Sequence, residues 1–260
     1  MIKLQARRGV CYEYPENTIS AYQAAVDQGC DLIECDPKFT KDGYIVLLHD
    51  RTLNRTARDK DGNPPAAEMP IKDITLQEAR QWEYGSWKDA RFKGEPIPTL
   101  SNLLDFAEKN AIPFKFDNVW ETFPPEMQEK FFDEIEARGE KVHIGFTCRH
   151  PEMLKKAADR FPHADLHYDG GDLSAERLNQ VAEIAKGHHL YIWVCYDNQR
   201  TAWFKGTKAT PEVCRFVRQY GELGVWILAE REELAVAMRD LDAQIVETDG
   251  RIKPAWTKEI

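Results

Sequence analysis

Two carboxylates and a histidine stand at the ends of two expected strands. The segment of residues 29–50 reads GCDLIECDPKFTKDGYIVLLHD. Side chains two apart in a strand share a face, so Glu34 and Asp36 point the same way, and such a pair is able to hold one hard divalent cation. The turn TKDGY predicts a hairpin whose second strand ends at His49. We therefore expect an imidazole near a metal. The alternative is a surface acidic pair and a histidine bonded to Asp50.

These residues need a frame of strands and helices to bring them together. Apolar runs predict eight barrel strands, at residues 2–6, 31–36, 113–117, 142–147, 164–169, 190–196, 225–229 and 243–249. Expected helices separate them, at residues 15–29, 100–110, 125–139, 151–161, 174–187, 210–224 and 231–241. This alternation is typical of a parallel sheet closed by helices, and 260 residues suit one (β/α)8 TIM barrel. We expect a single domain over residues 1–260.

One stretch does not fit the barrel pattern. Residues 51–98 are too polar for a barrel core and carry DKDGNPP in their middle. The run QEARQWEYGSW within them predicts a helix and a turn. We interpret the stretch as a small insertion after the second barrel strand, lying at the mouth of the barrel, where loops commonly carry function.

Several ordered motifs are similar to those of a known family. The runs ARRGVCYEYPENTISAYQAAVDQG, LIECDPKFTKDG and LLHDRTLNRTA resemble the glycerophosphodiester phosphodiesterase family, and IPTLSNLLDFAEKN, GVWIL and IVETDG continue the resemblance. The resemblance implies a (β/α)8 barrel that cleaves phosphodiesters of glycerol with a divalent metal. By position it implies that Glu34 and Asp36 are metal ligands, His49 a catalytic histidine and Arg8 a phosphate contact.

Two departures from the family pattern concern the chemistry directly. The family has His-Arg-Gly after its first strand, whereas this chain has Arg7-Arg8-Gly9, so one of the two expected acid-base histidines is missing. In the third strand Asp117 stands where the family has a glutamate ligand, and Lys115 lies two residues before it on the same face. The metal site is therefore expected to be kept and the acid-base pair to be altered.

The remaining candidates lie on the later strands. The oxygen-only ligand set of Glu34, Asp36 and Asp117 favours Mg²⁺ or Ca²⁺ over zinc. Trp193 and Trp226 are expected to wall a substrate pocket, with a place in the barrel core as the alternative. His167 is a candidate to face the mouth and replace the missing acid, or else it is merely hydrogen-bonded.

Composition limits the partners. The net charge is −9, so the overall field does not attract nucleic acid, and an anionic substrate needs a local positive site, which Arg7, Arg8 and Lys115 with a metal would supply. No apolar run approaches the ~20 residues that cross a bilayer. No signal peptide is visible and the six cysteines are scattered without metal-ligand spacing, which indicates a cytoplasmic protein. The sequence does not indicate the oligomeric state.

These expectations lead to one function and one rival. The first is a metal-dependent hydrolase of glycerophosphodiesters or related small phosphodiesters, with His49 in acid-base catalysis. Arg7 binds phosphate rather than transferring protons, because a guanidinium stays protonated at neutral pH. Either the leaving group needs no proton, or another acid such as Lys115 or His167 supplies it. The rival is a catalytically impaired protein of the same fold that binds a phosphodiester or phosphate.

Overall fold

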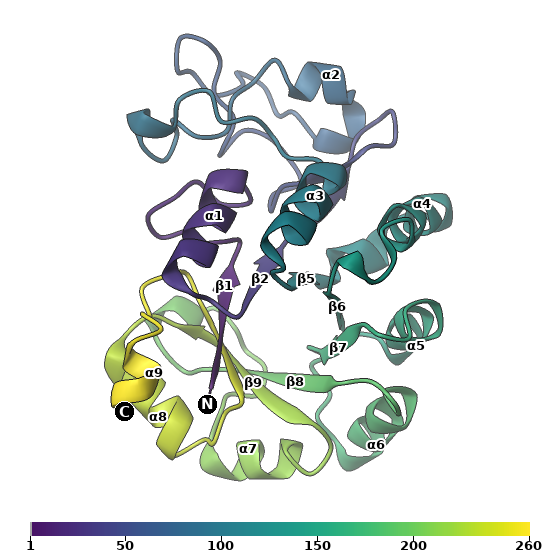
Figure 1. The fold of residues 1–260 in the computed structure, drawn as a ribbon, viewed down its shortest axis with the longest axis vertical. Helices are drawn as coiled ribbons and strands as arrows, with labels where there is room; N and C mark the ends of the chain where they lie inside the picture. The colour runs from purple at the N-terminus through teal and green to yellow at the C-terminus, as the bar shows by residue number, and fades with distance from the viewer. Residues whose placement is uncertain (1) are drawn as a thin grey trace.

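The computed structural model describes residues 2–260 as a closed barrel (Figure 1). Its eight parallel strands follow the order β1-β10-β9-β8-β7-β6-β5-β2. Their bounds are β1 Lys3–Arg7, β2 Leu32–Cys35, β5 Phe114–Phe116, β6 Ile144–Cys148, β7 Asp165–Tyr168, β8 Leu190–Cys195, β9 Glu222–Leu228 and β10 Ile245–Thr248. The expected (β/α)8 barrel and each of its eight strands are confirmed.

Helices connect consecutive barrel strands and cover the outside of the barrel, as Figure 1 shows. Their bounds are α1 Ile19–Gln28, α3 Leu100–Asn110, α4 Pro125–Glu136, α5 Pro151–Arg160, α6 Ala175–Ile184, α7 Pro211–Val217 and α8 Arg231–Arg239. The start and stop signals explain the first of them. The Thr18 side chain accepts a hydrogen bond from the Ala21 N–H, and Gly29 ends the helix with φ of +80°.

The insertion forms a unit with its own small core outside the barrel, visible at the top of Figure 1. A separate hairpin of β3 (Pro37–Phe39) and β4 (Ile45–Leu47) leads into it. The core that the insertion shares with this hairpin consists of Val46, Leu48, Leu53, Ala57, Ile71, Leu76, Ala79, Tyr84 and Ile97. Lys88 Nζ donates to Cys11 O at 2.8 Å, so the insertion packs on the loop that follows β1. This contact places it at the mouth, as expected.

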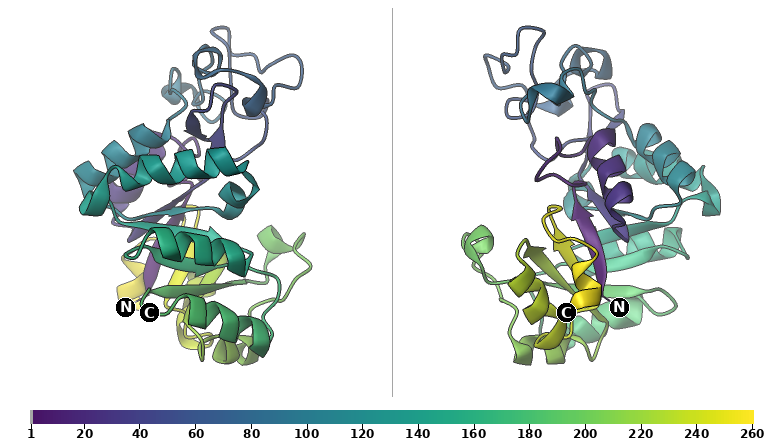
Figure 2. Two further views of the ribbon diagram at one scale, coloured as in Figure 1. Left: turned by 90° about the vertical axis from the view of Figure 1, so that its right-hand side faces the viewer. Right: turned by 60° about the vertical axis from the view of Figure 1, so that its left-hand side comes forward.

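The expected boundaries need three corrections. The helix of the insertion, α2, covers only Leu76–Ala79, because the chain turns immediately after it. β9 begins at Glu222, inside the expected helix 210–224, since pairing with β8 extends the strand towards its amino end. A short helix α9 (Trp256–Glu259) was not expected, and both views of Figure 2 place it beside the start of β1.

The cysteine side chains lie mostly in the core. All six cysteines are free, and five of them are buried. Among residues 2–260, no helix combines the length and apolar character that crossing a bilayer requires. The cytoplasmic location stays a prediction.

Candidate active site

A cavity of about 470 Å³ lies at the carboxyl ends of the barrel strands. In (β/α)8 barrels this face carries the active site, because loops and strand ends converge there. The cavity brings together nine residues singled out from the sequence, namely Arg7, Arg8, Glu34, Asp36, His49, Lys115, Asp117, Trp193 and Trp226. These residues lie on or just after β1, β2, β5, β8, β9 and the hairpin strand β4.

Glu34 and Asp36 are both buried at the end of β2 but have opposite electrostatic surroundings. Asp36 accepts a hydrogen bond from Asn17 Nδ2 at 2.7 Å and pairs with Arg8 Nε at 3.1 Å. Burial raises the pKa of Asp36, but Arg8 and other cations outweigh it and hold the pKa below its ordinary value. Among residues 2–260, Glu34 accepts a hydrogen bond only from the Arg8 N–H, at 2.9 Å, and burial together with Asp36 raises its pKa well above the ordinary value. An added cation would relieve that repulsion.

Lys115 and Asp117 come from β5, on the strand next to β2. Burial, followed by repulsion from Asp36, raises the pKa of Asp117. Lys115 is buried with its Nζ 4.3 Å from the centre of the Trp193 ring and 3.6 Å from Glu247 Oε2. Lys115 is therefore an inward-facing cation over an aromatic wall, not a solvated surface lysine.

The two arginines after β1 have different surroundings. The chain turns at Arg8, with φ of +55°, and at Gly9, where a Cβ would lie 2.7 Å from Ala21. Arg8 is buried and pairs with Asp36 and with Glu16 Oε1 at 3.1 Å. Arg7 keeps part of its side chain exposed, with Nε 3.5 Å from Glu247. Burial would lower the pKa of Arg7, but Glu247, Glu34 and Asp36 outweigh it and raise the pKa further. Arg7 therefore stays cationic.

His49 is oriented by an aspartate. Its Nδ1 lies 2.7 Å from Asp50 Oδ1, which leaves Nε2 available to the cavity when Nδ1 carries the proton. Arg55 donates to Asp50 through Nε at 2.7 Å and to Glu16 through Nη2 at 2.7 Å. Burial raises the pKa of Asp50, but hydrogen bonds from Arg55 and His49 lower it to about 2. A continuous ion-pair network therefore runs from Asp50 through Arg55 and Glu16 to Arg8.

His167 does not lie at the mouth, contrary to one expectation. It is 0% exposed within β7 and accepts a hydrogen bond from Trp193 Nε1 at 3.0 Å. Burial lowers its pKa well below the ordinary value. The residue packs under the cavity, stacked against Tyr191 and Trp193, because its side chain points into the barrel rather than above it.

The cavity contains further polar and aromatic residues that the sequence analysis did not single out, including Asn118, Arg149, Asp169, Trp203, Phe204 and Glu247. The strand-end rule alone indicates Arg149, Asp169 and Glu247, since these follow or end β6, β7 and β10. Trp203 and Phe204 follow the short helix η5 (Gln199–Thr201), and no strand pattern in the sequence points to them.

The three carboxylates offer only oxygen donors to a divalent metal. Within residues 2–260, no three His, Cys, Asp or Glu side chains form a ready-made ligand cluster. Asp36 already uses one oxygen on Asn17 and Arg8. The donor chemistry nevertheless fits a hard cation, because all three groups are carboxylates, Glu34 and Asp36 are buried and Asp117 half-buried, and Glu34 and Asp117 have raised pKa values. The ligand set therefore stays a prediction.

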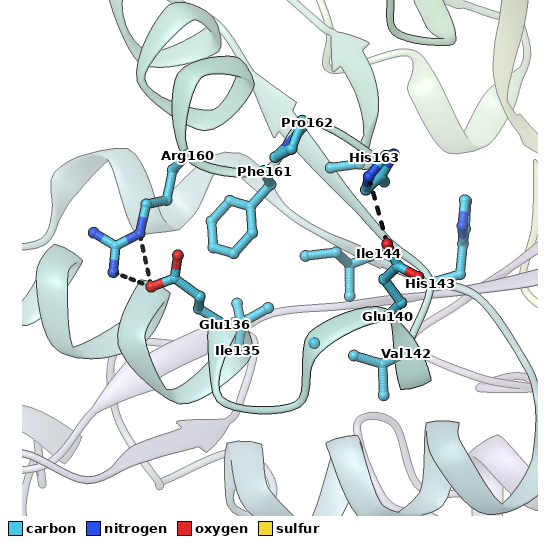
Figure 3. Close-up of a pocket in the computed structure, with 12 residues that line it drawn as sticks. Ile135, Glu136, Glu140, Val142, His143, Ile144, Arg160, Phe161, Pro162 and His163 are labelled. Carbon is cyan, nitrogen blue, oxygen red and sulfur yellow. Dashed lines mark hydrogen bonds and ion pairs between the residues drawn. The ribbon is translucent and has the colours of Figure 1, made fainter.

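A second cavity, of about 510 Å³, lies away from this chemistry (Figure 3). It is bounded by the ends of α4 and α5 and by residues before β6, which places it at the amino end of the barrel. Its polar rim is internally paired, with His163 Nε2 3.6 Å from Glu140 and Arg160 Nη2 2.6 Å from Glu136. We assign the site to the mouth, where charged groups face open space.

Fold and site together define a (β/α)8 barrel with a charged pocket at the carboxyl ends of its strands. The model of the glycerophosphoryl diester phosphodiesterase family matches residues 8–233. A glycerophosphodiester phosphodiesterase of Bacillus altitudinis is 31% identical over 196 residues, covering 74% of this chain and 76% of the relative. The chain belongs to the glycerophosphoryl diester phosphodiesterase family, a family of phosphoric diester hydrolases.

Other relatives are matched over a shorter part. A glycerophosphodiester phosphodiesterase of Caldanaerobacter subterraneus is 39% identical over 100 residues, 38% of this chain and 38% of the relative. A Bacillus subtilis relative is matched over 37% of its length. Among solved structures, the phosphodiesterase of Oleispira antarctica in complex with the product sn-glycerol-3-phosphate has a TM-score of 0.74 at 20% identity, covering 96% of this chain and 93% of that one. At that identity the likeness shows the fold alone.

Proposed function

We propose that the protein hydrolyses glycerophosphodiesters or related small phosphodiesters. The proposal rests on one observation. In this member of the family, His49, Arg7 and three carboxylates all line the cavity at the mouth. A phosphodiester fits because the pocket offers cationic groups beside an oriented imidazole. The rival function is binding without turnover, which the arginine in place of the first histidine favours.

The cationic residues are assigned to the phosphate. Arg7 remains charged and partly exposed, and Arg149 lines the cavity with a guanidinium that pairs with no carboxylate of residues 2–260. A guanidinium presents its N–H donors in a fork that matches phosphate oxygens. Lys115 adds a third positive charge from below. Arg8 is assigned to holding Asp36, and its phosphate contact is indirect.

His49 is assigned as the general base. Asp50 holds Nδ1, so Nε2 takes the proton of the attacking water or substrate hydroxyl as that oxygen approaches phosphorus. Glu34, Asp36 and Asp117 would hold Mg²⁺ or Ca²⁺, which when bound supplies positive charge against the phosphate oxygens. Trp193 and Trp226 wall the space left for the alcohol part of the substrate.

A panel of diesters tests the function. Glycerophosphocholine, glycerophosphoethanolamine and a nitrophenyl diester should each be incubated with the protein and Mg²⁺ or Ca²⁺, and the released alcohol measured. We expect release from at least one of them that depends on the ion. Phosphate or diester binding with no release from any substrate would favour the rival.

Replacing Glu34 with glutamine is expected to abolish stabilisation by the ion. In the parent, an ion at 100 times its dissociation constant stabilises the fold by about 2.7 kcal/mol. The amide keeps an acceptor for the Arg8 N–H but loses the charge. The melting temperature of each protein with and without ion measures the effect. Glu183→Gln, on the exposed face of α6, is the control and should keep the shift. An equal shift in Glu34→Gln would remove Glu34 from the ligand set.

Replacing Arg7 with alanine is expected to raise KM more than it lowers kcat. A hydrogen bond to a charged group contributes about 1.5–3 kcal/mol, which corresponds to a ten- to hundred-fold loss in kcat/KM. Steady-state kinetics on the best diester of the panel give both constants. A fall in kcat with unchanged KM would instead assign Arg7 to the transition state alone.

A further inference from the structure

Asp169 is a free carboxyl group in the mouth cavity. It directly follows β7, and its N–H donates to Cys148 O at 2.9 Å, which fixes the backbone at the strand end. Its side chain lines the cavity and makes no hydrogen bond or ion pair with any side chain of residues 2–260. Burial and charges further away are what shift its pKa. A carboxyl group without partners in a polar cavity is available to a ligand.

Three of the other carboxylates at the mouth are engaged by protein donors, and the fourth, Asp117, is assigned to the ion. Glu34 accepts the Arg8 N–H at 2.9 Å, and Asp36 accepts from Asn17 at 2.7 Å. Glu247 accepts a hydrogen bond from Gln5 and lies 3.6 Å from Lys115 Nζ. These contacts fix the three groups as acceptors for protein donors. Asp169 has no such contact and is free to donate.

The surroundings of Asp169 favour the protonated form near neutral pH. Burial raises its pKa to about 7. The charged groups that face it are Lys115 and Asp117 from β5, Arg149 after β6 and Glu247 from β10. The two cations oppose the rise in pKa and the two carboxylates add to it, so burial decides the direction.

Two glycines keep the approach to Asp169 open. Gly170 and Gly171 also line the cavity. A Cβ on Gly170 would lie 2.1 Å from Tyr168 Oη, so a side chain does not fit there. Gly171 has no atom within 4 Å of its ideal Cβ position. The carboxyl group of Asp169 therefore faces the cavity with no side chain from the following loop between them.

Asp169 and His49 stand on opposite walls of the mouth. β7 lies three strands from β2 by the shorter way round the eight-stranded barrel. His49 stands on the other side, because Leu48 N donates to Asp36 O at 2.9 Å and so holds the end of the hairpin beside β2, the neighbour of β1. In displacement at phosphorus, the attacking and leaving oxygens lie roughly in line on opposite sides. A base on one wall and an acid on the other match that geometry.

We propose that Asp169 is the catalytic acid that protonates the leaving oxygen, in place of the histidine that this chain lacks at Arg7. The inference rests on the proposed function. The oxygen of the water or hydroxyl forms a bond to phosphorus while its proton passes to His49. The bond from phosphorus to the leaving oxygen breaks with its electron pair, and that oxygen takes the proton of Asp169. Transfer of the proton from His49 to water and of a proton from water to Asp169 restores both groups.

Leaving groups of different basicity test the assignment. In Asp169→Asn we expect kcat on an alkyl diester to fall by about 10²–10⁴-fold, whereas a nitrophenyl diester, whose leaving group needs no proton, changes by no more than a few-fold. In the parent, the alkyl rate should fall as pH rises through about 7, because the acid loses its proton, and the variant should lack that descending limb. Asp169→Glu should regain part of the alkyl rate. Asp197→Asn is the matched control, because Asp197 is an acid that follows β8 and is 74% exposed. This variant should keep the parent rate on both substrates.

The outcomes separate this inference from the function on which it rests. If Asp169→Asn loses equal activity on both diesters, or loses none, Asp169 is not the catalytic acid, but the proposed hydrolase function is unaffected. A carboxyl carbon resonance, assigned by its disappearance in Asp169→Asn, gives a readout without turnover. Titration with a midpoint near 7 supports the assignment, and a midpoint near 4 overturns it. A parent that cleaves neither diester overturns the proposed function, and this inference with it.

Discussion

Replacing His49 with alanine is expected to lower kcat on a nitrophenyl diester by about 10²–10⁴-fold, the usual contribution of a positioned acid-base group. The nitrophenyl leaving group needs no acid, so the loss measures the base alone. KM should change little, because the phosphate is assigned to Arg7 and Arg149 rather than to the imidazole. Steady-state kinetics at pH 7 with saturating ion provide the measurement.

The chain offers a matched control for this variant. His150 is also an exposed histidine beside a carboxylate, with Nδ1 3.0 Å from Glu121 Oε2, but it does not line the cavity. His150→Ala should therefore keep the parent rate. Asp50→Asn should fall between the two, because the amide can still contact Nδ1 but no longer stabilises the imidazolium. Full activity in His49→Ala would mean that the base lies elsewhere, and the proposed mechanism would be wrong.

The part of the site that the sequence predicts follows from one geometric rule. Parallel strands of a closed barrel end at the same face, so polar residues at strand ends meet there whatever their distance in the sequence. Glu34, Lys115 and Asp117 were placed in this way, from two strands that pair with each other. The same rule extends to Asp169 and Glu247, which the family pattern did not mark. Site residues that the family pattern does not mark are therefore predicted only by identifying each barrel strand and the residue at its end.

The partners of these residues could not be predicted, because they depend on loops. Arg55 reaches both Asp50 and Glu16 through donors 2.7 Å from their oxygens, and no periodicity relates residues 16, 50 and 55. His167 shows the converse error. It lies in β7, two residues before Asp169, yet it is fully buried beneath the cavity and accepts a hydrogen bond from Trp193. The alternation of residues along a strand predicts which side of the sheet a side chain lies on, but not how far it lies below the mouth of the barrel.

Replacing Arg8 with methionine is expected to lower the free energy of unfolding by about 3–5 kcal/mol at pH 7, because removing one partner of a buried pair leaves a charge without compensation. The side chains of Arg8 and Asp36 are 8% and 5% exposed, so solvent screens the pair weakly. Methionine has a similar length and keeps most of the packing. Urea unfolding of parent and variant measures the difference. Arg8→Lys, which keeps the charge and the backbone strain at φ of +55°, should lose less.

The dependence of this loss on pH identifies its cause. Arg8 and other cations hold the folded pKa of Asp36 below its ordinary value, so this contribution is fully present above the unfolded pKa of about 4 and disappears as pH falls through the folded pKa. In Arg8→Met, burial lacks its main counterweight and favours the protonated acid, so the variant gains stability relative to the parent as pH falls. The difference in unfolding free energy should therefore be largest at pH 7 and shrink below pH 4. A difference that stays constant over this range would mean that Arg8 stabilises the loop by packing, and that Asp36 does not need it to remain charged.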